Sequence, residues 1–445
     1  MSDLRGSSEL ARQGGAMQDP SAPPRVLRPN RTQLEWRPVD LEGVLPADHR
    51  ARVVWEFVEG LDLGPLYQAI RAVEGHAGRP AIDPAILMAV WLYATLEAVG
   101  SARALERLCE QHDAYRWLCG GVAVNYHTLA SFRVGHGAVL EQLLTHSVAA
   151  LMAAGQVPLE RIAQDGVRVR ASAGRGSFRR RPRLEAGLAA AEAHVAALRR
   201  EVEEDPVATT RRQRAARERA ARERQARVQA ALAELPALEA YAARRAKKDG
   251  RAPRAVRAST TDPEARVMKM ADGGFRPAFN VQLAADTASQ LIVGVAVTNA
   301  GTDQGQLAPM LEGMQRRYGR TPAAVLADGG YVALEDIRAV GQRAAGCRVY
   351  APPPAAPTRA GRPLWRADDV TIAEWRQRMC TPEAAKIYKE RAATIECVNA
   401  LARNRGLQRF LVRGVARVRA VVLWLALAHN LLRAVTLPRL HPATG

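Results

Sequence analysis

The sequence has little cysteine, a deficit of acidic side chains and no long hydrophobic run. Its five cysteines form no C-x-x-C pair and have no histidines clustered around them, so we expect reduced, mostly buried thiols rather than disulfides or a zinc site. The most apolar run, residues 420–432, contains His429 and Asn430 and is too short to span a bilayer, which predicts a buried helix and no membrane partner. Residues 1–30 lack the apolar stretch of a signal peptide, so we expect a disordered tail on a cytoplasmic protein.

The charge balance is the strongest signal in the composition. Lys and Arg number 64 against 45 Asp and Glu, which gives a net charge of +19 and a pI near 10.6. A GC-rich genome would explain Arg in place of Lys, but it would not explain the surplus over acidic residues. Excess positive charge favours a polyanionic partner, most often nucleic acid.

Residues 31–155 are predicted to form an all-helical N-terminal domain that binds DNA. Asp83 and Ser101 are the expected N-caps of two helices, and Gly120-Gly121 ends the helix that Ser101 begins. The next helix presents Arg133 as a candidate DNA contact. A helix, a glycine turn and a second helix are compatible with a DNA-binding helix-turn-helix, although any helical bundle gives the same pattern.

Residues 156–435 show strand patterns and are predicted to form a second domain, followed by a tail at 436–445. Its class is α+β or α/β: a meander of three strands and then βα units give a mixed sheet flanked by helices. Residues 179–250 interrupt this domain with two long helices, predicted as an inserted, coiled-coil-like helical hairpin. The arginines of its second helix fit either a solvated arm or an electrostatic arm on DNA, and both remain open.

Three acidic residues are candidates for chemistry because of where they fall. Asp165 lies on the first strand, Asp328 ends a later buried strand, and Glu396 lies on a helix that could pack across the same sheet edge. If the two strands are neighbours, three carboxylates without His or Cys make a hard oxygen site suited to Mg²⁺ or Mn²⁺. Two such ions roughly 3.5–4 Å apart can activate a hydroxyl and stabilise the leaving oxygen of a phosphodiester.

The surroundings of these acids set two further expectations. Strict alternation places Asp165 on the side of Val167, unless Gly166 bulges the strand. Other acids nearby are interpreted as structural because they occupy turn or cap positions: Asp262, Asp286 and Asp303. In the last helix Glu396, Asn399 and Arg403 have helical spacing, so a carboxylate and a cation share one face.

Several short motifs follow one another in a fixed order. They are Gln164-Asp165-Gly166 with Ala171-Ser172-Ala173, Thr261-Asp262-Pro263-Glu264-Ala265, Phe279-Asn280-Val281-Gln282, Thr302-Asp303-Gln304, Ala327-Asp328-Gly329-Gly330-Tyr331, Tyr388-x2-Arg391-x4-Glu396 and Arg409-Phe410-Leu411-x-Arg413-Gly414. This ordered set closely resembles the bacterial insertion-sequence DDE transposases with a Y-R-E signature helix. The segment from Gly78 to Gly120 resembles the helical domain that precedes their catalytic core, and the resemblance covers nearly all of residues 31–435.

The resemblance implies an RNase H-like catalytic domain in which Asp165, Asp328 and Glu396 bind a pair of Mg²⁺ or Mn²⁺ ions. It implies cleavage of double-stranded DNA at the element's terminal inverted repeats and strand transfer into target DNA. Such a protein would work in the bacterial cytoplasm at the nucleoid, as at least a homodimer when it holds two ends. Tyr388, Arg391 and Arg403 match signature positions expected near the DNA backbone.

Two features depart from the better-known signature. That signature has three residues between its Arg and Glu, whereas four separate Arg391 from Glu396, which would place them well apart around a regular helix. Arg403 stands where Lys is usual, which keeps the charge and changes its geometry. Two alternatives remain: an inactive or repurposed transposase that regulates by binding DNA, and an RNase H-like nuclease that ignores the repeat sequence.

Overall fold

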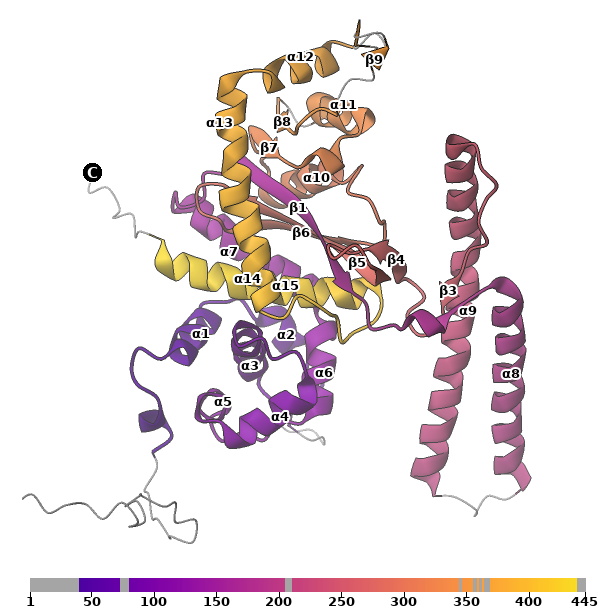
Figure 1. Cartoon of the computed structure of the whole chain (residues 1–445). Helices are drawn as coiled ribbons and strands as arrows, with labels where there is room; N and C mark the ends of the chain where they lie inside the picture. The colour runs from indigo at the N-terminus through magenta and orange to yellow at the C-terminus, as the bar shows by residue number, and fades with distance from the viewer. Residues whose placement is uncertain are drawn as a thin grey trace, which may run out of the picture. The chain divides into compact units, whose positions relative to one another are not determined.

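The computed structural model describes residues 40–72, 80–204, 210–343, 346–354, 358–359, 362–363 and 369–437. The predicted tail at 1–30 and nearly all of the one at 436–445 lie outside these ranges. Within them, a mostly helical N-terminal region precedes a mixed sheet with helices, in agreement with the predicted α+β class. Figure 1 follows the chain through these elements.

The N-terminal region is built around one apolar helix. Its elements are η1 (Glu42–Val44), α1 (Arg50–Glu59), α2 (Gly64–Gln68), α3 (Pro84–Leu96), α4 (Ala102–Gln111), α5 (Asp113–Cys119), α6 (Tyr126–Gly135) and α7 (Gly137–Ala153). Nearly every residue of α3 is buried, and Asp83 caps it as predicted by accepting from the Ala85 N–H. Ser101 caps α4 as predicted. The helix expected to continue to Gly120 instead divides at His112, whose side chain caps α5.

The sheet has six strands of mixed direction. They are β1 (Arg161–Arg170), β4 (Arg266–Lys269), β5 (Phe275–Asp286), β6 (Ile292–Thr298), β7 (Ala324–Leu326) and β8 (Arg348–Tyr350). The order is β4-β5-β1-β7-β8, with β6 also paired to β5. β1 is antiparallel to β5 and parallel to β7, and β7 is parallel to β8. The helices α10 (Leu307–Tyr318) and α11 (Leu334–Arg343) connect the later strands, so the expected meander and βα units are present, with the short β4 added.

The register of β1 decides which side chains share a face. It pairs with β5 without a shift from Ile162 to Arg170, so Gly166 does not bulge the strand. The only register shift recorded for β5 lies between Ala284 and Ala285, where it pairs with β6. Strict alternation therefore places Asp165 on the face opposite Gly166.

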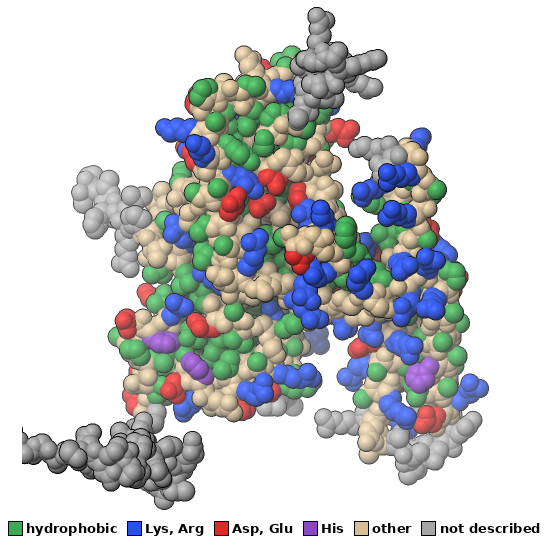
Figure 2. All heavy atoms as spheres, viewed as in Figure 1, with side chains coloured by type: hydrophobic (Ala, Val, Ile, Leu, Met, Phe, Trp, Pro, Cys, Tyr) green, Lys and Arg blue, Asp and Glu red, His purple; other side chains and the backbone are tan. Residues whose placement is uncertain are grey.

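The helical insertion forms an arm between β1 and β4. It comprises η2 (Arg175–Ser177), β2 (Phe178–Arg179), α8 (Arg181–Glu204), α9 (Arg211–Asp249) and β3 (Ala258–Ser259). The helices α8 and α9 lie side by side as a hairpin (Figure 1), around a small apolar cluster that includes Leu184, Val228 and Leu235. Lys and Arg side chains are frequent along its surface (Figure 2).

The C-terminal helices pack against the sheet. They are α12 (Val370–Met379), α13 (Pro382–Arg391), a π-helical segment labelled η4 (Ala392–Glu396), α14 (Cys397–Asn404) and α15 (Val415–Thr436), preceded by the short strands β9 (Thr358–Arg359) and β10 (Arg362–Pro363). By length and composition α15, with 22 residues, could cross a membrane, so the expectation that this run is too short was wrong. It is nevertheless a buried helix, as expected: it contacts α3, α6, α7 and β6, and Asn430 hydrogen-bonds both the N–H and the C=O of Ile292.

Candidate active site

Asp165 and Asp328 come from neighbouring parallel strands. Ala163 of β1 is paired with Leu326 of β7, and each aspartate lies two residues further along its own strand direction. The condition set from the sequence, that the two strands are neighbours, is therefore met. Asp328 also caps the 3-10 turn η3 (Gly329–Tyr331), where its Oδ1 accepts from the Gly330 N–H at 2.8 Å.

Asp165 is half-buried, with 19% of its side chain exposed, whereas 56% of the Glu396 side chain is exposed. Its Oδ2 accepts from Asn399 Nδ2 at 2.8 Å, and its Oδ1 accepts from the Gly166 N–H at 3.0 Å. Burial raises the pKa of Asp165, and the charge of Asp328 adds to this, while the Arg391 guanidinium acts in the opposite direction. These opposing influences show that the three charged groups lie within one electrostatic neighbourhood.

Arg391 contacts two of the candidate acids. Its Nη1 lies 2.8 Å from Glu396 Oε1, and its Nη2 lies 3.6 Å from Asp165 Oδ1. The expectation that four intervening residues would place Arg391 and Glu396 well apart was wrong. The helix is π-helical over Ala392–Glu396, and a π turn accommodates one residue more than an α turn, so residues five apart share a face.

Neighbouring contacts fix this irregular turn. Gln290, in the β5–β6 hairpin, donates its side-chain N–H to the Ala393 carbonyl at 2.9 Å. The Thr394 hydroxyl donates to the Glu390 carbonyl at 2.8 Å, and Glu390 itself pairs with Arg161 of β1 at 2.9 Å. The helix that carries Glu396 is thus held to the sheet just before the π segment and within it.

The predicted DNA contacts lie in different surroundings. Tyr388 is half-buried beside the acids: burial raises its pKa, and Asp328, Glu396 and Asp165 add to the rise. Arg403 is exposed on α14. Arg133 lies in α6, where its guanidinium stacks 4.7 Å from the Trp91 ring centre and donates to the Gly100 carbonyl. These contacts give Arg133 a packing role within the helical region.

The other acids of the region have structural partners. Asp286 accepts from the Ser289 N–H and hydroxyl in the hairpin turn, as its turn position predicted. Asp262 accepts from the Gly414 N–H ahead of α15. Asp303 does not cap α10, whose N-cap is Gln306. Its carboxylate instead lies buried among polar side chains of the sheet.

Sequence reasoning noted the spacing of Asn399 but did not identify it as a partner of Asp165. The two residues are 234 positions apart, so no local pattern could connect them. Asn399 is 2% exposed, and its Oδ1 is a buried oxygen without a hydrogen-bond partner. A buried acceptor without a donor calls for a ligand or a water.

The donor set fits a hard divalent cation by chemical type. Asp165, Asp328, Glu396 and the unpartnered Asn399 Oδ1 offer only oxygen atoms, which Mg²⁺ and Mn²⁺ prefer. Among the residues that the structure describes, however, no three His, Cys, Asp or Glu side chains converge into a metal-binding group. Arg391 accounts for part of this, since its guanidinium lies against Asp165 and Glu396.

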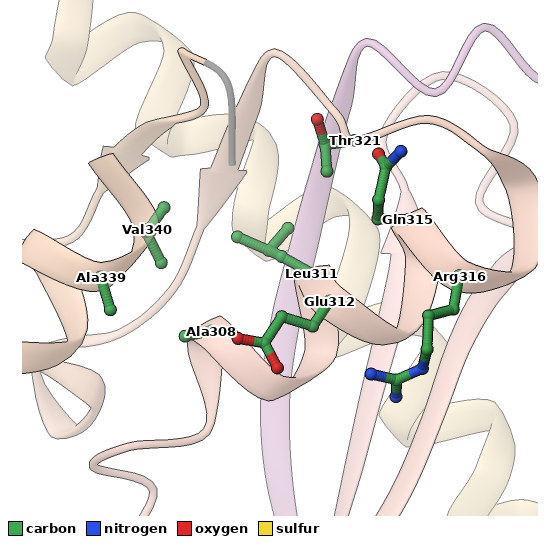
Figure 3. Close-up of a pocket in the computed structure, with 8 residues that line it drawn as sticks. All are labelled: Ala308, Leu311, Glu312, Gln315, Arg316, Thr321, Ala339 and Val340. Carbon is green, nitrogen blue, oxygen red and sulfur yellow. The ribbon is translucent and has the colours of Figure 1, made fainter. Parts of the chain in front are cut away.

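A cavity of about 240 Å³ lies elsewhere, between α10 and α11. Figure 3 shows Leu311 and Glu312 of α10 on one side and Val340 of α11 on the other. None of the candidate acids lines it, so it is separate from the site described above.

Two known protein families match this chain. Residues 39–134, which contain α1 to α5 and most of α6, match a transposase domain (DUF772), and residues 253–431 match the transposase DDE domain. The comparisons with curated proteins and with solved structures find no match. The two families, in this order along the chain, identify a transposase. More specifically, the chain belongs to the DDE transposases of insertion sequences.

Proposed function

We propose that this transposase cuts DNA at the terminal inverted repeats of its element and joins the cut ends to target DNA. The observation that carries the proposal is the parallel pairing of β1 with β7, in which Asp165 and Asp328 each follow the paired residues Ala163 and Leu326 by two positions. Glu396 is the third member because the π segment turns it toward the same guanidinium, that of Arg391, that lies against Asp165.

The strand order supports an RNase H-like catalytic domain. That fold has a five-stranded mixed sheet in which the second strand is antiparallel to its neighbours and the first and fourth are parallel. Here β1, β5, β6, β7 and β8 play those five parts in chain order, with β5 antiparallel to β1 and β6. The arm interrupts the domain between the first and second of these strands.

The residues of this site have three proposed roles: metal binding, orientation of a metal ligand and contact with DNA. Asp165, Asp328 and Glu396 would hold a pair of Mg²⁺ or Mn²⁺ ions, and Asn399 orients Asp165 through its 2.8 Å hydrogen bond. The bound ions would supply activation of the attacking hydroxyl and stabilisation of the leaving oxygen. Tyr388 and Arg391, in α13, and Arg403, in α14, would contact the DNA backbone.

The basic composition supports double-stranded DNA as the partner, since the chain carries a net charge of +19. Because two element ends must be held at once, we propose a homodimer in the synaptic complex. DNA substrates place the protein at the nucleoid in the bacterial cytoplasm.

The test is cleavage of a fragment carrying the element's own end, compared with the same fragment scrambled, in Mg²⁺. We expect cutting at the true end only, and we expect Asp328→Asn to lose cutting by at least about a thousandfold while keeping DNA affinity. The substitution retains Oδ1, so the η3 cap survives.

The other results of this test have definite meanings. Equal cutting of both fragments identifies a nuclease without end specificity. Wild-type protein that binds the true end and never cuts it identifies a DNA-binding regulator. Cutting retained by Asp328→Asn overturns the assignment of Asp328. For a transposase, a nuclease or a regulator alike, the affinity for DNA should fall steeply as the salt concentration rises, because contacts to phosphates release counterions.

A further inference from the structure

A cluster of buried polar side chains lies on the face of the sheet opposite Asp165. We call it the Gln282 cluster; its members are Gln164, Asn280, Gln282, Asp303 and Tyr331, each at most 7% exposed. Gln282 is paired with Gly166 across β1 and β5, whereas Asp165 is paired with Leu283, so the cluster lies directly behind Asp165. Buried polar groups are costly unless hydrogen-bonded, so such a cluster needs an explanation.

Gln282 is the centre of the cluster because its side-chain amide makes all four hydrogen bonds open to it. Its Oε1 accepts from the Tyr331 hydroxyl and from Gln164 Nε2, the latter at 3.1 Å. Its Nε2 donates to Asp303 Oδ1 at 2.8 Å and to Asn280 Oδ1 at 3.2 Å. A fully satisfied amide has one orientation, so it fixes the positions of its partners relative to one another.

Asp303 ties the cluster to the backbone of β1 beside Asp165. Its Oδ1 accepts from Asn280 and Gln282, and its Oδ2 pairs with Arg168 at 2.8 Å. A Cβ atom on Gly166 would lie 2.1 Å from Asp303 Oδ1 and 2.5 Å from Gln282 Nε2. The cluster can therefore press against β1 only because residue 166, next to Asp165, is glycine.

Tyr331 ties the same cluster to Asp328. It is the last residue of the 3-10 turn that Asp328 caps, and its N–H donates to the Asp328 carbonyl at 3.2 Å. Its buried hydroxyl donates to Gln282 Oε1. Gln304 reinforces the link, because its Nε2 donates to the Val332 carbonyl just after the turn.

We propose that Gln282, with Asp303 and Tyr331, is a positioning centre that fixes the Asp328 turn relative to the Asp165 strand. The chain of contacts runs from Asp328 through Tyr331 and Gln282 to Gly166, which adjoins Asp165. The proposal rests on the proposed function, since it assigns these residues the task of holding two metal-binding carboxylates at a fixed separation. It also explains why four of the motifs in the sequence, around residues 165, 281, 303 and 329, converge in space.

The test compares two Tyr→Phe variants of the full chain. Tyr331→Phe removes the hydroxyl that reaches Gln282 and keeps the buried ring. Tyr318→Phe is the matched control: its hydroxyl, in α10, donates to the Val293 carbonyl at 3.0 Å, away from the acids. The readouts are Mn²⁺ affinity in the absence of DNA, followed by electron paramagnetic resonance, the Mg²⁺ concentration for half-maximal cleavage, and the melting temperature.

We expect Tyr331→Phe to weaken Mn²⁺ binding and to raise the Mg²⁺ requirement by about tenfold, as loss of a supporting hydrogen bond does at metal sites. Tyr318→Phe should lower the melting temperature to a similar extent and leave both metal readouts unchanged. Gly166→Ala should act in the same direction as Tyr331→Phe, because Asp303 and Gln282 must shift away from the new Cβ. Gly135→Ala, where nothing lies within 4 Å of the added Cβ, is its control.

The outcomes separate this proposal from the proposed function. If Tyr331→Phe and Gly166→Ala bind Mn²⁺ as tightly as wild type while Asp328→Asn does not, the positioning role is overturned and the metal site stands. If Asp328→Asn binds Mn²⁺ and cuts DNA like wild type, the proposed site fails and the positioning role fails with it.

Discussion

The arm and the helix that carries Glu396 both use Arg–Glu pairs, in contrasting surroundings. On the arm, Arg222 pairs with Glu218 four residues away, and the two side chains are 57% and 41% exposed. On the other helix, Arg391 is 12% exposed. It pairs with Glu396, five residues away and 56% exposed, and with Asp165, on a strand and 19% exposed. The first pair belongs to a regular α-helix in water, and the second depends on a π turn and a neighbouring strand.

The difference teaches that the energy an ion pair contributes depends on its burial and on its other partners, and not on the residue types alone. Exposed pairs at this spacing contribute about 0.3–0.5 kcal/mol and are screened by salt. Arg391 instead offsets two carboxylates in a partly buried site, where charges interact more strongly and unpaired charge is costly. Breaking contacts at the site should therefore have larger effects than breaking an exposed pair on the arm.

The largest effect should come from changing the length of the π segment. Insertion of one Ala after Ala393 cannot be absorbed by the same turn, so Glu396 would rotate by about 100° relative to Arg391. We expect end-specific cleavage to fall by at least about a thousandfold, which corresponds to about 4 kcal/mol. Cleavage assays on the element end, with circular dichroism to confirm folding, measure this.

Deletion of Ala393 is the matched control. It leaves three residues between the Arg and the Glu, which a regular α-helix places on one face. We therefore expect the deletion variant to keep cleavage within about tenfold of wild type, despite losing the Gln290 contact. Equal loss of activity in both variants would show that the π turn has a role beyond absorbing one extra residue.

A buried carboxylate away from the site extends the comparison to stability. Burial raises the pKa of Asp262 from 3.8 to about 6, while the N–H groups of Gly414 and Glu264 act in the opposite direction. A raised pKa means that the folded state binds the proton more tightly than the unfolded state. The contribution of protonated Asp262 to the free energy of unfolding is therefore fully present below about pH 4. It is lost as the pH rises from about 4 to about 6.

We expect Asp262→Asn to remove this loss. The rise in the pKa of Asp262 from 3.8 to about 6 corresponds to a change in the free energy of unfolding of about 3 kcal/mol at most. Relative to wild type, the variant should thus gain up to that amount between pH 4 and pH 8. Urea unfolding at both pH values measures the gain, and a difference between variant and wild type that does not change with pH would contradict it.

The sequence predicts features here that depend on local chemistry. The caps Asp83 and Ser101 were predicted because a short polar side chain before an apolar run satisfies free N–H groups locally. The sequence left open whether the strands before Asp165 and Asp328 are neighbours, and the parallel pairing of β1 with β7 answers this. The division at His112 was missed because a histidine can also cap a helix, which its usual propensity does not indicate.

The rest of the site depends on contacts between distant residues. Helical periodicity assumes a regular turn, so it placed Arg391 and Glu396 on different faces, and only the π turn corrects this. Asp303 has the sequence context of a cap, yet its carboxylate binds Asn280, Gln282 and Arg168. Neither result could be derived from neighbouring residues, because the partners come from other elements.

A smaller effect is expected when Arg391 is neutralised. Arg391→Gln removes a cation that lies against Asp165 and Glu396, so Mn²⁺ affinity without DNA should rise by about tenfold, or about 1.4 kcal/mol. Isothermal titration calorimetry measures this. Arg276→Gln is the control, since Arg276 pairs with Asp272 in the turn before β5, away from the candidate acids, and should leave the affinity unchanged. Weaker Mn²⁺ binding in Arg391→Gln would mean that the guanidinium supports the metal site.

The smallest effect belongs to the arm. Arg222→Gln breaks an exposed pair on α9 whose partner, Glu218, is one turn away. Because water solvates both side chains, the free energy of unfolding should change by no more than about 0.5 kcal/mol. Urea unfolding in low and in high salt measures the change, which should shrink further as salt screens the pair. A loss well above this size would mean that Arg222 is engaged by more than Glu218, and the contrast between arm and site would then weaken.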